Sequence, residues 1–316
     1  MRYSDQDRES ENVEDRRGEG GGMFQRGGGI PIPIGGGGLS ITSLLIIGAI
    51  CLLLGINPLD LLSGSEGIPR MPEVPRTSPG SRSPFEIPAG RQPRVAAQND
   101  EMSRFVRRVL ADTEDVWDRV FQAAGKRYEK PTLVMFSGAT RTECGIGQSA
   151  MGPFYCPIDR KVYIDLDFYR ELKDRFNAPG DFAQAYVIAH EVGHHVQQLL
   201  GVGDKVQALK QQALQRGDQV RANGYQVRME LQADCLAGVW ASLDNKLKNR
   251  LEPGDIESGL NAASQIGDDT LQRRAQGRVV PESFTHGSSK QRVRWFKKGL
   301  DSGQTQACDT FGAAEL

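Results

Sequence analysis

Three of the four histidines in this chain lie within six residues, in the stretch AHEVGHHVQ from Ala189 to Gln197. On a helix, His190 and His194 lie about 40° apart and project from adjacent turns of one face. Glu191 lies about 100° round from His190, where a carboxylate can act as a base without binding the ion. Two imidazoles and a carboxylate in this HExxH spacing are typical of zinc hydrolases. The spacing therefore predicts His190 and His194 as metal ligands and Glu191 as the catalytic base.

A catalytic zinc site also needs a third protein ligand and an open coordination position. The metzincin pattern is excluded, because Gln197 and Leu200 stand where it requires glycine and histidine. Further along, the stretch MELQADCLAGVWA from Met229 to Ala241 carries two acids on a strongly apolar helical pattern. We predict that Glu230 completes a His₂Glu ligand set. Asp234, one turn later on the same face, is predicted to accept the second ring N–H of a ligand histidine.

The other two histidines have different surroundings in the sequence. His195 points away from the face that carries the ligand pair, which predicts a structural or surface role. His286 lies in a loop before the last predicted helix. Hydrolysis of an amide needs a donor for the developing oxyanion, and His286 is a candidate for this catalytic role. The rival donors are Tyr225, Arg292 and Arg294.

These side chains must be positioned by helices. A helix from Asp181 to Gly201 is predicted, with Asp181 and Gln184 as a capping box and Gly201 just past its end. The sequence predicts an α+β class, mainly helical with a small sheet. Two strands are expected, at 132–137 and 161–169. Further helices are expected from Asn99 onward, over about 205–249 with breaks near 216–217 and 223–224, over 255–276, and from Ser288–Ser289 to near Gly299.

The N-terminal part of this 316-residue chain differs in composition from the rest. Residues 1–38 include a glycine-rich run that cannot bury enough apolar surface to fold, which predicts a disordered tail. Residues 39–56 carry no charge, and as a helix ~27 Å long they would cross a bilayer core as one transmembrane helix. Residues 57–98, rich in proline, glycine and serine, predict an extended linker. The metallopeptidase domain is expected over 99–316.

Charge and cysteine content bear on partners and compartment. With 39 basic and 40 acidic residues, the chain lacks the basic excess of a nucleic-acid-binding protein, so no nucleic-acid partner is predicted. The four cysteines outside the apolar run suggest two disulfides in an oxidising compartment, the alternative being four reduced, buried thiols. Together with a weak positive-inside signal, this favours a single-pass protein of the cytoplasmic (inner) membrane with an extracytoplasmic catalytic domain. The four cysteines are Cys144, Cys156, Cys235 and Cys308.

Several of these motifs resemble the neutral zinc metallopeptidase family of bacteria, the YpfJ-like proteins. The motifs are AHEVGHHVQ, ELQADCLAGVWA, GPFYCP followed by KVYIDLDFY, FTHGSSKQRVRWF and, at the start, RESENVEDRRG. The resemblance implies a single-pass membrane protein with a zincin-like metalloprotease domain. It also implies that His190, His194 and Glu230 bind Zn²⁺ and that Glu191 is the base. HExxH with a downstream ExxAD is also similar to the membrane-associated gluzincins of the HtpX and CAAX-prenyl-protease type.

These patterns together predict a membrane-anchored zinc metallopeptidase that acts on a peptide or protein substrate. Zinc would lower the pKa of its bound water, and Glu191 would take the proton as the hydroxide attacks a peptide carbonyl. Glu191 would then return the proton to the leaving amine. Two alternatives stay open. One is a non-catalytic membrane scaffold with a structural zinc site, which would normally use four protein ligands. The other is a zinc hydrolase of a non-peptide amide.

Overall fold

The computed structural model describes residues 1–17, 92–174 and 180–316. Within these ranges no helix combines the length and the apolar character needed to cross a membrane. The predicted transmembrane helix, 39–56, lies outside the described residues, as does most of the predicted linker. The described residues form a mainly helical α+β fold with a small sheet, as the sequence predicted.

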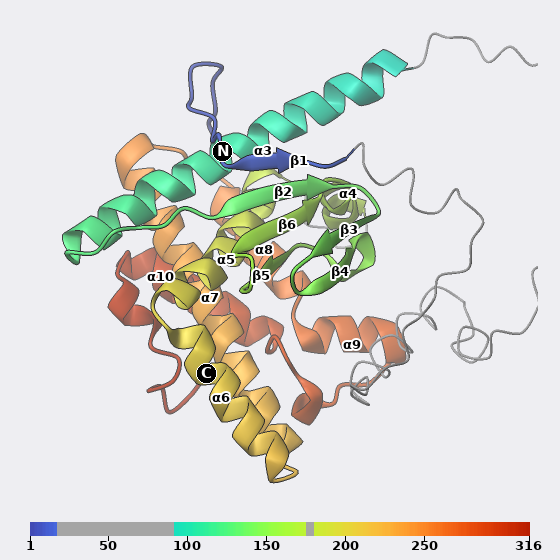
Figure 1. The fold of residues 1–316 in the computed structure, drawn as a ribbon, viewed down its shortest axis with the longest axis vertical. Helices are drawn as coiled ribbons and strands as arrows, with labels where there is room; N and C mark the ends of the chain where they lie inside the picture. The colour runs from blue at the N-terminus through green and yellow to red at the C-terminus, as the bar shows by residue number, and fades with distance from the viewer. Residues whose placement is uncertain (18–91, 175–179) are drawn as a thin grey trace, which may run out of the picture. The chain divides into compact units, whose positions relative to one another are not determined.

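The main sheet has four strands in the order β1–β2–β6–β5 (Figure 1). The strands are β1 (Val13–Asp15), β2 (Thr132–Phe136), β5 (Phe154–Cys156) and β6 (Lys161–Asp165). The first three in this order run parallel, and β5 pairs antiparallel with β6 at the edge. A separate hairpin consists of β3 (Ala139–Thr142) and β4 (Gly145–Gln148). The predicted strand 161–169 ends early because the Asp165 carboxylate accepts the backbone N–H of Asp167 and a helix begins there.

Strand β1 corrects the prediction of a disordered tail over residues 1–38. Residues 1–17 fold into the domain, with Val13 beside Leu133 in the sheet. A buried carboxylate, Glu114, holds the segment: Ser10 Oγ donates to it at 2.5 Å, and the Arg8 guanidinium at 2.8 Å. Polar contacts to a distant helix therefore order a segment that has no apolar pattern of its own.

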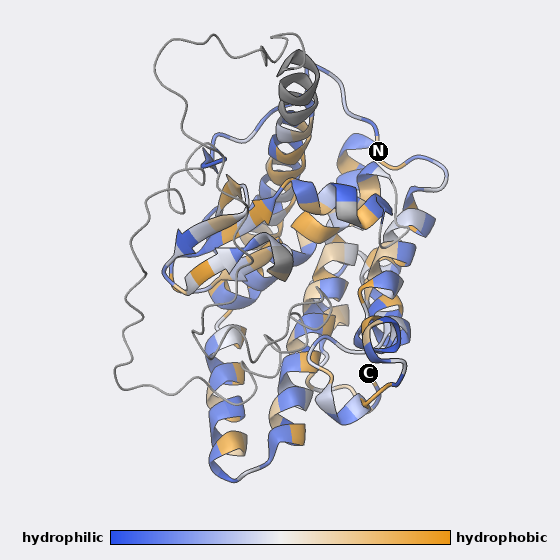
Figure 2. Cartoon of the chain, turned by 90° about the vertical axis from the view of Figure 1, so that its right-hand side faces the viewer, coloured by the Kyte–Doolittle hydropathy of each residue, from blue (hydrophilic) through white to orange (hydrophobic). Residues whose placement is uncertain are grey.

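The helices build most of the domain. They are α3 (Gln92–Ala123), α4 (Asp167–Asp174), α5 (Asp181–Leu199), α6 (Val202–Gln215), α7 (Gln219–Lys248), α8 (Asp255–Gln265), α9 (Asp268–Gln276) and α10 (Ser289–Ser302). Helix α5 contacts the sheet through β5 and β6 and also packs against α7 and α8. Helix α7 in turn contacts α6 and α10. Figure 2 shows hydrophilic and hydrophobic residues alternating around these helices, as expected for elements with one buried face.

Several predicted boundaries differ from the structure. Helix α3 begins at Gln92, so the domain's first helix starts inside the predicted linker. Helix α7 runs unbroken through Asn223–Gly224, where the Asn223 amide donates to the Glu282 carbonyl at 2.9 Å. The break at Arg216–Gly217 is confirmed, and it joins α6 and α7 into a helical hairpin that projects from the rest of the domain (Figure 1). The predicted helix 255–276 is divided into α8 and α9.

Two disulfides connect these elements. Cys144 pairs with Cys156, which ties the β3–β4 hairpin to β5. Cys235 pairs with Cys308, which ties α7 to the short 3₁₀ helix η4 (Thr305–Cys308). Helices α7 and α10 approach closely at Gly299, where a Cβ atom would lie 1.9 Å from the carbonyl oxygen of Cys235. The pairing confirms the expectation of two disulfides.

Candidate metal centre

The HExxH stretch lies in the middle of α5, a helix whose residues are buried on almost every side. Gly193 is the point where α5 meets α7. A Cβ atom at Gly193 would lie 3.1 Å from the backbone oxygen of Ala233, closer than such atoms normally approach. The missing side chain lets the two helix backbones come together. The acidic residues of α7 are thereby brought up to the histidines of α5.

Three predicted ligands converge at this crossing. The Glu230 carboxylate Oε2 lies 3.2 Å from Nε2 of His190 and 3.3 Å from Nε2 of His194. One ligand atom from each of the three residues lies within 4.8 Å of the others, and all three residues are buried. Two imidazole nitrogens and a carboxylate oxygen are donors that suit zinc. The residues present therefore fit a His₂Glu zinc site.

Asp234 holds His190 from behind, as predicted. Nδ1 of His190 donates to Asp234 Oδ1 at 2.8 Å, which leaves Nε2 for an ion. Arg292 on α10 donates to both carboxylate oxygens, through Nε at 2.9 Å and Nη2 at 2.8 Å, and Tyr186 adds its hydroxyl. Burial would raise the pKa of Asp234, but the charges of Arg292 and His190 lower it to about 2. Asp234 is thus a fixed, fully compensated anion.

His194 has a different, uncharged support. Its Nδ1 donates to Oε1 of Gln197 at 2.8 Å, and Nε2 of Gln197 donates to the Met229 carbonyl on α7 at 2.8 Å. In the sequence, Gln197 is one of the two residues that exclude the metzincin pattern. Its position three residues after a ligand histidine, on the same helix face, was a signal that could have identified this role.

Neighbouring charges shift the pKa values of the ligand residues. Burial would lower the pKa of His190, but the charge and hydrogen bond of Asp234, helped by Glu230, raise it to about 10. Burial would likewise raise the pKa of Glu230, yet the charge of His194 and hydrogen bonds from both histidines lower it well below its usual value. The cluster thus attracts positive charge strongly at the point where the three ligand atoms meet.

Glu191 is buried with 8% of its surface exposed, on the same helix as the two histidines. No residue in the described parts of the chain donates a hydrogen bond to its carboxylate. Its oxygens are therefore available to a water molecule, as the predicted general base requires. His195, by contrast, uses both ring nitrogens: Nε2 donates to the Glu129 carbonyl at 2.6 Å and Nδ1 accepts from the Tyr155 hydroxyl. His195 is a buried structural residue.

His286 lies in the loop between η3 (Pro281–Ser283) and α10. Asp268 at the start of α9 orients this loop by accepting the backbone N–H groups of Thr285, His286 and Gly287. The ring Nδ1 lies 3.3 Å from the same carboxylate, which leaves Nε2 free. Desolvation would lower the pKa of His286, but the hydrogen bond from Asp268 and the charge of Glu230 raise it. The His286 side chain is 51% exposed, and the interaction with Glu230 is one of charge.

Two of the three rival oxyanion donors are engaged by other groups. Arg292 is occupied beneath Asp234. Arg294 points to the C-terminal end of the chain, where it donates to the Leu316 carbonyl. Tyr225 lies half-buried on α7. Asp268, which positions His286, was not identified from the sequence, because its partners lie about twenty residues away in the chain.

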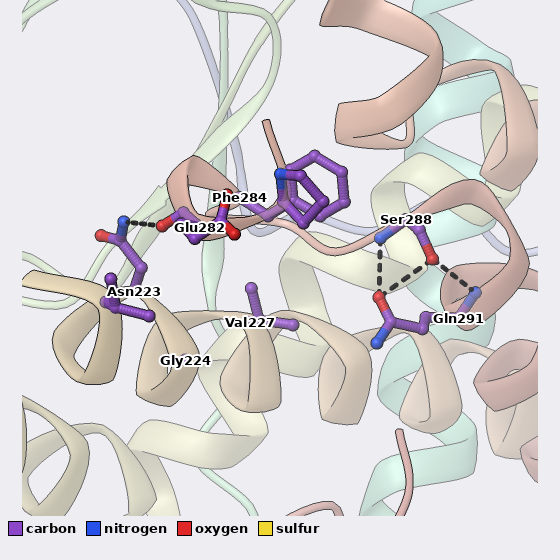
Figure 3. A pocket seen from close by; sticks show the side chains of 9 residues that line it. Asn223, Gly224, Val227, Glu282, Phe284, Ser288 and Gln291 are labelled. Atoms are coloured by element: carbon purple, nitrogen blue, oxygen red, sulfur yellow. Dashed lines mark hydrogen bonds between the residues drawn. The ribbon is translucent and has the colours of Figure 1, made fainter. Parts of the chain in front are cut away.

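Two hollows are lined in part by residues of α7. One, of about 310 Å³, is shared by α5, α6, α7 and the end of β5, and it includes His194 and Glu230. The other, of about 450 Å³, lies between α7 and the loop that leads into α10. Figure 3 shows the Val227 side chain pointing toward the loop that carries Phe284, with Asn223 bonded to Glu282 at one end. The ligand residues His194 and Glu230 line the first of these hollows and not the second.

Comparison with known proteins identifies the family of the chain. The family described as "Putative neutral zinc metallopeptidase" matches residues 1–311, so the chain belongs to that family. The chain is 50% identical over 305 residues to "Uncharacterized protein YpfJ" of Escherichia coli (strain K12), covering 96% of this chain and 97% of that protein. It is 42% identical over 226 residues to "Uncharacterized protein Rv2575" of Mycobacterium tuberculosis (strain ATCC 25618 / H37Rv), covering 68% and 74%. No solved structure matches significantly.

Proposed function

We propose that the chain is a zinc-dependent peptidase that hydrolyses peptide bonds at the cluster of His190, His194 and Glu230. The observation that supports this most directly is the convergence of three buried ligand atoms beside a carboxylate, Glu191, that has no partner among the described residues. A structural zinc site normally has four protein ligands and is closed. The described residues supply three at this point, and a hollow opens onto two of them.

Each residue has a distinct task in the proposed reaction. When bound, zinc supplies a Lewis acid that activates water and polarises a carbonyl oxygen. Glu191 takes a proton from the attacking water and returns it to the leaving amine. Asp234 and Gln197 hold the ring nitrogens of His190 and His194, which keeps the two Nε2 atoms directed at one point.

His286 completes the proposed site as the donor to the developing oxyanion. Asp268 binds its Nδ1 and supports the protonated ring, so that Nε2–H is free to donate. A donor of this kind contributes most when it is positioned before the reaction begins. The three backbone hydrogen bonds from the loop to Asp268 provide that positioning.

For localisation, we propose attachment to the inner membrane through residues 39–56, with the catalytic domain in an oxidising, extracytoplasmic space. The two disulfides support the compartment. The sheet restricts how residues 39–56 can attach: a single crossing by 39–56 would separate β1 from β2, whereas the two strands are paired. The proposal therefore departs from the single-pass expectation: residues 39–56 attach to the membrane without a single crossing, and residues 1–17 lie on the same face as the domain.

The test uses purified full-length protein, its zinc content and its cleavage of an unfolded protein. We expect Glu191→Gln to bind zinc like the wild type and to lose roughly 10²- to 10⁴-fold in rate, because a general base is removed without changing the ligands. Glu257→Gln, on exposed α8 surface, is the matched control. Cleavage by Glu191→Gln at the wild-type rate would refute the mechanism. Parallel assays on acylated amines test the alternative of a non-peptide amide substrate.

A further inference from the structure

Lys210 lies on the buried face of helix α6, where the spacing of the buried residues predicts an apolar side chain. The buried residues of α6 are Val206 and Ala213. Lys210 follows Val206 by four residues and precedes Ala213 by three, so all three lie on one stripe of the helix. That stripe faces α7, the helix against which α6 packs. Lys210 is half-buried, and this burial lowers the pKa of its ammonium group.

This ammonium group has no carboxylate partner among the described residues. Its Nζ donates to Oε1 of Gln226, a neutral amide on α7. Nε2 of Gln226 then donates to Oε1 of Glu230 at 2.6 Å. An ammonium group has three donors, and one is used here. Lys210 thus places a positive charge near the ligand cluster, and this charge forms no salt bridge with a described carboxylate.

The hollow of about 310 Å³ beside the cluster is where the remaining donors can act. Among the residues that the structure describes, Lys210 is the only lysine or arginine that lines it. The lining acids are Glu230, which the metal would occupy, and Asp204, which is exposed and lies almost two turns earlier on α6, where it accepts from Gln198. The end of the hollow nearest Glu230 is therefore cationic.

We propose that Lys210 binds a carboxylate group of the substrate beside the scissile bond, either an acidic side chain or the C-terminal carboxylate of the peptide. This inference rests on the proposed peptidase function and names the substrate class of the same site. Lys210 acts here as a specificity residue. The hydrogen bond to Gln226 keeps its long side chain extended toward the cluster when no substrate is present.

The experiment compares matched peptides that differ by one charge. Internal glutamate is replaced by glutamine at each position beside the scissile bond, and separately a free C-terminus is replaced by an amide. We expect the wild type to favour one kind of carboxylate roughly 10- to 100-fold in kcat/KM, the usual effect of one charged hydrogen bond. Lys210→Met should remove this preference and leave neutral peptides within about threefold, and Lys210→Glu should reverse it. Lys205→Met, exposed on the same helix, is the control.

The competing role for Lys210 is to position Glu230 through Gln226. In that case Lys210→Met would slow all peptides equally and weaken zinc binding, and this result would overturn the proposal. Cleavage by the wild type with no preference for carboxylates would also overturn it while leaving the peptidase function intact.

Calorimetric binding of the same peptides to Glu191→Gln protein, with and without zinc, gives a readout independent of hydrolysis. If the wild type cleaves nothing but binding still depends on the carboxylate and on Lys210, the peptidase function fails and the carboxylate site stands. If binding shows no such dependence, the carboxylate site is refuted.

Discussion

The two sides of the ligand cluster are built in opposite ways. Behind His190, the side chains of Tyr186, Asp234 and Arg292 form a network with at most 3% of any residue exposed. In front, the α6–α7 hairpin presents Lys210 and Gln226 to an open hollow. The rear contains a matched charge pair, whereas the front contains an unmatched cation. The difference indicates that the rear fixes the geometry of the ligands and the front is available to a substrate.

The substitution Arg292→Met, which removes a member of the rear network, should have the largest effect. It leaves Asp234 ionised and buried without its main partner, and removing one member of a buried pair costs about 3–5 kcal/mol. We expect chemical denaturation of the full chain to show a loss of that size. Arg294→Met, 52% exposed on the same helix, is the control and should stay within about 0.5 kcal/mol of the wild type. Similar losses for both variants would show that the rear network is not special.

The two disulfides also allow the two sides of the site to be compared, by the stability that each disulfide contributes. Cys235–Cys308, at the rear, spans 73 residues, whereas Cys144–Cys156, near β5, spans 12. Each contributes about 2–5 kcal/mol, and the longer loop should contribute about 1.5 kcal/mol more if chain entropy dominates. Paired cysteine-to-alanine variants, compared by thermal denaturation, measure this difference. A larger loss of stability on removing Cys144–Cys156 than on removing Cys235–Cys308 would contradict this expectation.

Zinc affinity distinguishes the charged support of one histidine from the neutral support of the other. Asp234→Asn should weaken zinc binding about 10- to 100-fold, the usual effect of losing a partner of a ligand histidine. Gln197→Met removes a neutral hydrogen bond and should cost less than about tenfold. Competition with a coloured chelator, on protein whose helicity is unchanged, measures both. Equal losses would mean that charge at the rear does not tune the site.

A second buried acid on α7 sharpens the contrast with Asp234. Neither carboxylate oxygen of Asp244 has a hydrogen-bond partner in the described structure. Burial, with the charge of Asp112, raises the pKa of Asp244 to about 7. The folded state then binds more protons than the unfolded state between about pH 4 and 7, so this group should make stability fall as pH rises through that window.

We expect Asp244→Asn to remove this pH dependence and to stabilise the protein at pH 8 by at least about 1 kcal/mol, because a buried charge without partners is lost. Urea denaturation at pH 4.5 and pH 8 measures the effect. Asp301→Asn, on exposed α10 surface, should change neither value. A loss of stability at pH 8 would mean that the ionised Asp244 is compensated.

The sequence predicted the part of the site that depends on helical spacing. His190, Glu191 and His194 follow from one turn of one helix, and Glu230 and Asp234 from one turn of another. Gln197, Lys210 and Asp268 were missed as functional residues because their significance depends on partners in other elements. Strand β1 was missed for a related reason: its residues, VED, have no strand pattern, and the ion pairs that hold the segment join it to a helix about a hundred residues later.

Strand β1 also has a consequence for the order of synthesis. Val13 is synthesised before its partner Leu133, which is 120 positions later in the chain. Parallel pairing over such a distance forms late, because a long loop must close before any contact rewards it. Strand β1 can therefore take its place in the sheet only after the much later strand β2 has been made. The sheet can therefore be completed only if residues 39–56 leave β1 and β2 on the same side of the membrane.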